Sequence, residues 1–149
     1  MRFSANLGFL WTERPLTDAI RAAKAAGFAA VEMHWPYATP PEEVRQVLDE
    51  TGLPLLGLNT VRGNPGENGL SALPGRRAEA RQAVDQALAY AEAAGAGAVH
   101  VMAGFAEGAD AHAAFIATLR YAAAAADPMG ETEPTLAWMS KLGASSEIP

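Results

Sequence analysis

Short apolar runs alternate along the chain with longer stretches in which apolar residues have helical spacing. The short runs predict strands over residues 2–10, 28–33, 53–59 and 98–102. The longer stretches predict a helix after each strand: one capped by Thr12 or Glu13 that ends before Gly27, one that begins at 39–43 and ends before Gly52, and two over 76–94 and 109–126. Strict alternation of this kind is typical of an α/β fold with a parallel sheet and right-handed crossovers.

Two parallel architectures fit this order, an open doubly wound sheet and a (β/α)₈ barrel. Periodicity alone does not separate them. An open nucleotide-binding sheet typically has a glycine-rich phosphate loop after its first strand, whereas this chain has Trp11-Thr12-Glu13-Arg14 there. A nucleotide-binding fold is therefore disfavoured. The stretch 60–75 has no clear period and is predicted to be a long functional loop.

Composition narrows the classes of function. The chain has no cysteine, which excludes disulfides, thiolate metal sites and a cysteine nucleophile. A net charge of −6 without a dense basic run argues against nucleic acid or an anionic membrane as a partner. No apolar stretch approaches the roughly 20 residues of a membrane helix, and the first residues do not resemble a signal peptide. We therefore expect a cytoplasmic protein that binds a small molecule.

Each predicted strand contributes a hydrogen-bonding side chain within its apolar run or at its end: Asn6, Glu32, Asn59 and His100. In (β/α)₈ barrels the functional site lies at the C-terminal ends of the strands, and a buried ionisable group needs a partner to offset its desolvation. We interpret these four residues as substrate-binding residues. The alternative is that Glu32 and His100 satisfy one another or nearby backbone.

No known catalytic or metal-binding motif in the sequence indicates which reaction the protein catalyses. The chain contains no HExxH, GxSxG, EF-hand or zinc-ligand spacing. His34, in the turn after the second strand, and His112, at a helix start, are interpreted as surface residues. The sequence therefore assigns no catalytic residue and no metal ligand.

Five segments occur in an order and spacing that point to one enzyme family. They are Arg2-Phe3-Ser4-Ala5-Asn6-Leu7, Ala30-Val31-Glu32-Met33 followed by Pro36-Tyr37, Leu58-Asn59-Thr60, the loop 66–76, and Val99-His100-Val101-Met102-Ala103-Gly104. Over residues 1–126 the chain resembles the hydroxypyruvate isomerase family, which belongs to the xylose isomerase-like TIM barrels. The resemblance implies the N-terminal half of a (β/α)₈ barrel, with four βα units.

The resemblance also implies an activity, the interconversion of hydroxypyruvate and tartronate semialdehyde, with longer 2-oxo sugar acids as substrates of close relatives. In this family a divalent metal, Mg²⁺ or Mn²⁺, polarises the substrate oxygens and two glutamates transfer the proton. These groups belong to the second half of the barrel. We therefore expect an isomerase-like chain without activity and without tight metal binding of its own.

Residues 127–149 do not resemble the family. No β-branched apolar run follows Gly130, and Pro134 and Gly143 bracket at most a short helix. Glu131 and Glu133 lie in flanks unlike those of a family strand, so no catalytic role is assigned to them. The hypothesis is that a truncation or frameshift replaced the second half of the barrel.

Three further expectations concern partners. A half-barrel would leave two strand edges and an apolar face uncovered, which favours a homodimer, with capping by apolar residues of the tail as the competing solution. A catalytically silent assembly or ligand-binding module is the alternative to an isomerase. An endonuclease of the same barrel superfamily is disfavoured because the charge of −6 supplies no phosphate-binding face.

Overall fold

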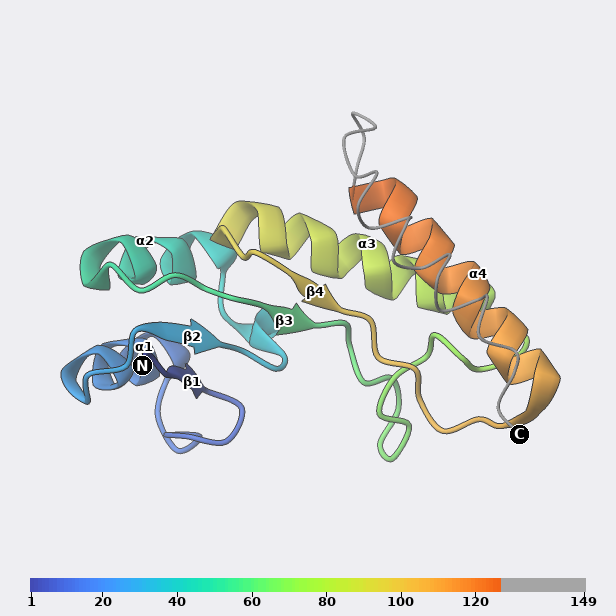
Figure 1. Ribbon diagram of the computed structural model, residues 1–149, viewed down its shortest axis with the longest axis horizontal. Helices are drawn as coiled ribbons and strands as arrows, with labels where there is room; N and C mark the ends of the chain where they lie inside the picture. Colours follow the sequence, from blue (N-terminus) through green and yellow to red (C-terminus); the bar gives the residue numbers. More distant parts are fainter. Residues whose placement is uncertain (127–149) are drawn as a thin grey trace.

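The predicted alternation of strands and helices is present in the computed structural model, which describes residues 1–126 (Figure 1). Its elements are β1 (Ser4–Asn6), α1 (Leu16–Ala25), β2 (Ala30–Glu32), the short 3₁₀ helix η1 (Pro36–Ala38), α2 (Pro41–Thr51), β3 (Leu58–Asn59), α3 (Arg77–Ala94), β4 (Val99–His100) and α4 (Gly108–Ala126). The short helix expected after Pro134 and the proposed boundary to a divergent tail lie outside the described residues.

The strands pair in parallel and in chain order. β1 pairs with β2 so that Asn6 lies opposite Glu32, and β3 pairs with β4 so that Asn59 lies opposite His100. A parallel bridge at Leu55 and backbone hydrogen bonds join β2 to β3. Within residues 1–126 the result is one run of four parallel strands that does not close on itself.

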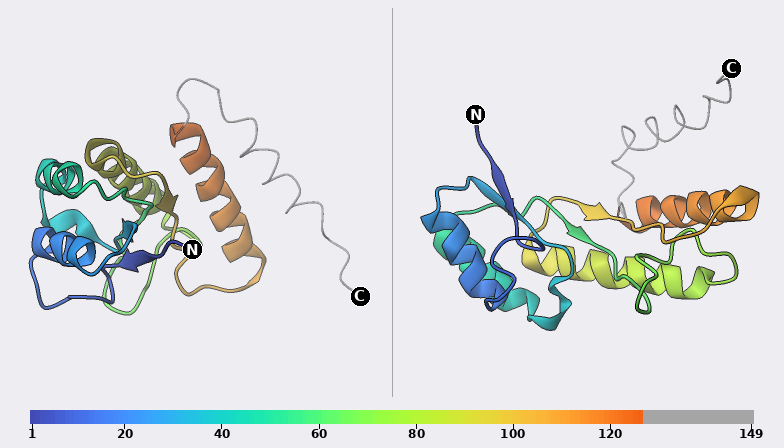
Figure 2. Two further views of the ribbon diagram at one scale, coloured as in Figure 1. Left: turned by 60° about the vertical axis from the view of Figure 1, so that its left-hand side comes forward. Right: turned by 90° about the horizontal axis from the view of Figure 1, so that it is seen from below.

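α1, α2 and α3 cover one face of this run, and α4 packs on α3. Neighbouring helices pack in chain order, α1 on α2, α2 on α3 and α3 on α4, and Figure 2 shows α4 lying along α3. Because successive strand residues point to opposite faces, Ala5, Val31 and Leu58 point toward the helices and are buried with Ile20 of α1 and Val44 of α2. At roughly 25 cal/mol per Å² of apolar surface, this layer is the main stabilising contribution to the fold.

The strands are shorter than the sequence predicts. The first was expected over residues 2–10 with Ala5, Leu7 and Phe9 on one face, but β1 ends at Asn6, and Phe9 is 75% exposed whereas Ala5 and Leu7 are buried. Residues beyond Asn6 turn back on themselves, since the amides of Phe9 and Leu10 donate to the Asn6 carbonyl. A turn leaves no partner strand, so the apolar alternation there does not produce burial.

The predicted cap of the first helix is also wrong. α1 begins at Leu16, after Pro15, and no side chain caps it. The fixed φ of proline already favours the entry into a helix, so neither Thr12 nor Glu13 is needed there. The ends of α2 and α3 are as predicted: Gly52 and Gly95 follow them in the left-handed conformation, with φ of 65° and 76°.

Across 1–126 the structure contains no helix whose length and apolar character would let it span a bilayer.

Candidate functional site

A groove runs along the sheet face opposite the helices and encloses about 640 Å³. All four residues that the sequence singled out line it: Asn6, Glu32, Asn59 and His100. Each is the last residue of its strand, including Glu32 and His100, which were expected inside their strands. Because the strands are parallel, their carboxyl ends meet at the same edge of the sheet, and this brings the four side chains together.

Each of the four side chains makes a polar contact with a neighbouring residue. The Ser4 hydroxyl donates to Glu32 Oε1 at 2.6 Å, and the amide of Gly8 donates to Asn6 Oδ1 at 2.9 Å. On the other strand pair, His100 Nδ1 lies 3.3 Å from Asn59 Oδ1. Glu32 and His100 therefore do not satisfy one another, and the side-chain partners found here are Ser4 and Asn59 rather than the backbone that the alternative interpretation also allowed. Each has its own neighbouring partner and still faces the groove.

His34 is a fifth polar residue of the groove, and its expected surface position is wrong. It lies two residues after Glu32 and therefore on the same face, half-buried, with its ring edge-on to Phe9 at 4.7 Å between centroids. The ring packs so closely over Gly8 that a Cβ there would overlap it. The period-2 spacing from Glu32 is the signal that would have found it. His112 is exposed on α4, as predicted.

Aromatic residues after β2 fix the carboxyl end of β3. The indole Nε1 of Trp35 donates to the Thr60 carbonyl at 3.1 Å, and the Tyr37 hydroxyl donates to the Asn59 carbonyl. Behind them, Tyr90 of α3 donates to the Thr39 carbonyl at 2.9 Å and stacks edge-on with Tyr37. The backbone that presents Asn59 to the groove is therefore anchored to the helical layer.

Burial of these two phenols changes their acidity. Desolvation raises the pKa of Tyr90 from 10.0 to about 12, with a smaller contribution from the nearby carboxylates of Glu42 and Glu43. Desolvation also raises the pKa of Tyr37, and Tyr90 adds to it. Both phenols are therefore held in the neutral form that donates a hydrogen bond.

Whether these residues suit a divalent metal can be judged from their side chains. Among residues 1–126, no three His, Asp or Glu side chains converge in a way that could hold a metal ion. Glu32 and Asn59 offer oxygen atoms, but Mg²⁺ and Mn²⁺ need a larger set of oxygen ligands. The described residues alone therefore do not fit the metal that the resemblance implies.

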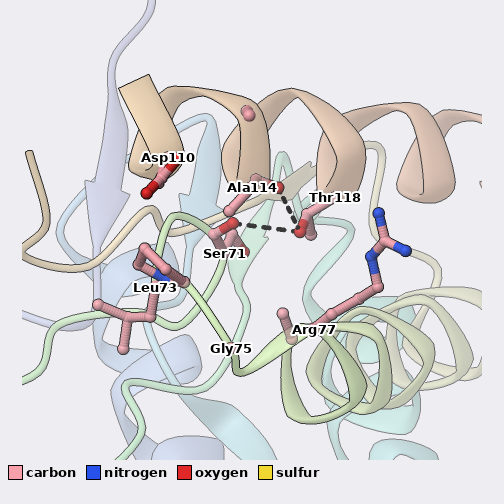
Figure 3. Close-up of a pocket in the computed structure, with 10 residues that line it drawn as sticks. Ser71, Leu73, Gly75, Arg77, Asp110, Ala114 and Thr118 are labelled. Atoms are coloured by element: carbon pink, nitrogen blue, oxygen red, sulfur yellow. Dashed lines mark hydrogen bonds between the residues drawn. The ribbon is translucent and has the colours of Figure 1, made fainter. Parts of the chain in front are cut away.

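A second, smaller pocket of about 270 Å³ lies between the loop after β3, the start of α3 and α4. The Thr118 hydroxyl crosses it to donate to the Ser71 carbonyl at 3.1 Å, and Figure 3 shows Arg77 and Asp110 on opposite sides. It contains none of the predicted site residues. It lies at the contact through which α4 packs against α3 and the loop after β3.

The fold and the groove define a class of protein: a parallel α/β unit with polar side chains at the carboxyl ends of its strands, as in barrel enzymes. Comparison with known families agrees. The family model of the xylose isomerase-like TIM barrel matches residues 20–135. The chain belongs to this family.

Several relatives are similar over most of the chain. A human protein named "Putative hydroxypyruvate isomerase" is 43% identical over 90% of the chain and 53% of its own length. A 2-oxo-tetronate isomerase of Haemophilus influenzae is 42% identical over 87% of the chain and 52% of its own length. The chain thus spans about half the length of these relatives.

One solved structure shows the same arrangement. The crystal structure of a protein described as AP endonuclease, family 2, from Brucella melitensis superposes with a TM-score of 0.80 at 36% identity. The match covers 87% of this chain and 52% of that one. The prediction of a TIM barrel family fold is confirmed over about half of that chain.

The raised pKa of Tyr90 predicts how stability changes at alkaline pH. The folded state favours the neutral phenol, so this stabilisation is fully present below pH 10 and is lost as pH rises toward 12. Tyr90→Phe should cost about 1 kcal/mol at pH 8 through its lost hydrogen bonds, yet lose stability less steeply above pH 10 than the wild type. Urea unfolding of both proteins between pH 8 and 12 measures this. Parallel curves would contradict the assignment.

Proposed function

We propose that the groove is the substrate-binding wall of an isomerase that acts on small hydroxy-oxo acids, of the hydroxypyruvate or 2-oxo-tetronate type. The convergence of Asn6, Glu32, Asn59 and His100 at the carboxyl ends of four adjacent strands carries this proposal. The names of the relatives support the same class of substrate.

The side chains suit a ligand rich in hydroxyl and carbonyl groups. The amides of Asn6 and Asn59 can both donate and accept hydrogen bonds, the Glu32 carboxylate accepts from hydroxyl groups, and His100 offers an imidazole nitrogen. Together they would bind such an acid and orient two adjacent carbons. An aldose-ketose isomerisation needs this orientation because it moves a proton between those carbons.

The finer assignment is the interconversion of hydroxypyruvate and tartronate semialdehyde, with longer 2-oxo sugar acids as the alternative. A bound Mg²⁺ or Mn²⁺ would polarise the carbonyl oxygen in such a reaction. Residues 1–126 supply no complete ligand set for it. The role proposed for the described residues is therefore to bind and orient the substrate.

DNA is a less suitable partner, although one structural relative carries an endonuclease name. Binding to DNA rests mainly on neutralising phosphates with Lys and Arg. Within residues 1–126 the groove is lined by the carboxylate of Glu32 and by no Lys or Arg, and the net charge of the chain is −6. A small acid needs far less positive charge than a nucleic acid backbone.

We expect the 149-residue chain to bind hydroxypyruvate without converting it in the presence of Mg²⁺ or Mn²⁺. Positioned acid-base catalysis contributes about 10²–10⁴-fold, and among residues 1–126 no group of His, Asp or Glu side chains could hold the metal that would accompany it. Calorimetry should show Asn59→Ala binding about tenfold more weakly than the wild type, the equivalent of about 1.4 kcal/mol. His112→Ala, on the exposed surface of α4, should bind as the wild type does.

Two results would contradict this assignment. Turnover close to that of full-length relatives that survives Glu131→Gln and Glu133→Gln would place the chemistry in this chain. Absence of hydroxypyruvate binding in the wild type would favour the alternative function, a non-catalytic module for assembly or for binding another small molecule.

The uncovered sheet supports a second proposal, a homodimer. Phe3 is 66% exposed and Leu56 is 45% exposed, and both belong to the sheet region rather than to the helical layer. Within the described residues β1 and β4 each pair on one side only. Exposed edges and apolar faces of this kind pair with other chains. Two copies related by a two-fold axis would supply the eight strands of a closed barrel.

Light scattering at micromolar concentration should therefore give twice the mass of one chain. Leu56→Glu should produce a folded monomer, because this side chain is exposed in a single copy and its charge would be buried in the dimer. Phe105→Glu is the matched control, since Phe105 is equally apolar and 72% exposed but lies in the loop before α4. A compact wild-type monomer that binds no hydrophobic dye would contradict the dimer.

A further inference from the structure

An acidic substrate places a negative charge in a groove whose wall, within residues 1–126, contains no Lys or Arg. The one acidic residue of that wall, Glu32, would repel the substrate carboxylate. A permanent cation at the border of the groove would offset this repulsion and favour the proposed substrate class. The following inference rests on that proposed function.

Arg62 lies at this border, in the loop after β3. Its guanidinium carbon is 4.4 Å from the centre of the Trp35 ring, and Trp35 is part of the groove wall. The Nε and Nη2 atoms of Arg62 donate to Asn68 Oδ1 at 3.1 and 2.8 Å. An aromatic face and an amide oxygen thus hold the guanidinium, and both are uncharged.

Neutral partners distinguish Arg62 from half of the other eight arginines within residues 1–126. The four that differ form salt bridges with carboxylates: Arg14, Arg21, Arg45 and Arg76. A paired guanidinium has its charge largely balanced, whereas Arg62 has no carboxylate partner within residues 1–126. Its positive charge is therefore available to an incoming anion.

The loop that carries Arg62 is closed and anchored. The amide of Gly69 donates to the Arg62 carbonyl at 2.7 Å, and Gly69 also bridges Ala103 beyond β4. Gly69 has φ of 127° and packs against the Met102 backbone without room for a Cβ. Asn68 is in the left-handed region with φ of 50°, which asparagine tolerates better than most residues. Because the loop is already ordered, binding would cost little conformational entropy.

We propose that Arg62 is a specificity-determining residue that binds the carboxylate of the substrate at the border of the groove. A guanidinium presents a planar array of donors that matches a carboxylate, and Trp35 and Asn68 hold its plane in place. Asn6, Glu32, Asn59 and His100 would then contact the hydroxyl and carbonyl groups of the same molecule. Arg62 would thus select acids over uncharged ketoses of similar size.

Two ligands that differ only at the carboxylate test this role. Hydroxypyruvate carries the carboxylate, and dihydroxyacetone has a hydroxymethyl group in its place. For the full chain, Arg62→Gln should weaken hydroxypyruvate binding about tenfold and change dihydroxyacetone binding less than twofold, as measured by calorimetry. Arg62→Lys should have an intermediate effect, because it keeps the charge and loses the planar donors. Arg77→Gln removes an exposed arginine at the second pocket and should leave both affinities unchanged.

The outcomes separate this inference from the function on which it rests. A wild type that binds both ligands, with Arg62→Gln weakening neither or both equally, would overturn the role of Arg62 and leave the groove as a binding site. A wild type that binds neither ligand would overturn the proposed function and the inference together. Thermal melting of each variant establishes that the loss is one of binding rather than of folding.

Discussion

Parallel pairing in one register is the constraint on which the rest of the structure depends. It sets Asn6 opposite Glu32 and Asn59 opposite His100. Because side chains alternate between faces, the same register sends Val31 and its neighbours into the helical layer. A slip of one residue would exchange the two faces. The hydrophobic core and the polar groove are therefore two consequences of a single set of backbone hydrogen bonds.

The helices could be predicted from the sequence because their signals are local. Apolar residues at helical spacing and glycines such as Gly52 and Gly95 mark α2 and α3 within a residue or two. The ends of the strands could not be predicted in this way. A strand ends where its hydrogen-bonded partner ends, and that partner is distant in sequence. For the same reason the turn after Asn6 was not foreseen.

The residues of the candidate site also fall into those that the sequence predicted and those that it did not. The polar residues on the predicted strands were found because a hydrogen-bonding group in an apolar run is conspicuous. His34 was missed because the strand was assumed to end in an exposed turn, and Arg62 because the loop around it has no period. The partner of Glu32 was also unforeseen: Ser4 comes from the neighbouring strand, and only the register brings the two together.

The family and the geometry together explain why the groove is open. The chain belongs to the xylose isomerase-like TIM barrel family and spans about half the length of the relatives that it matches. The four strands of its described residues are half of the number that closes such a barrel. The central claim is that the open face still binds a small hydroxy-oxo acid. A ¹H–¹⁵N NMR titration of the 149-residue chain with hydroxypyruvate tests this claim most directly. The account predicts shifts in the side-chain amides of Asn6 and Asn59 and in the ring of His100, whereas shifts confined to the Ser71–Thr118 pocket, or none, would contradict it.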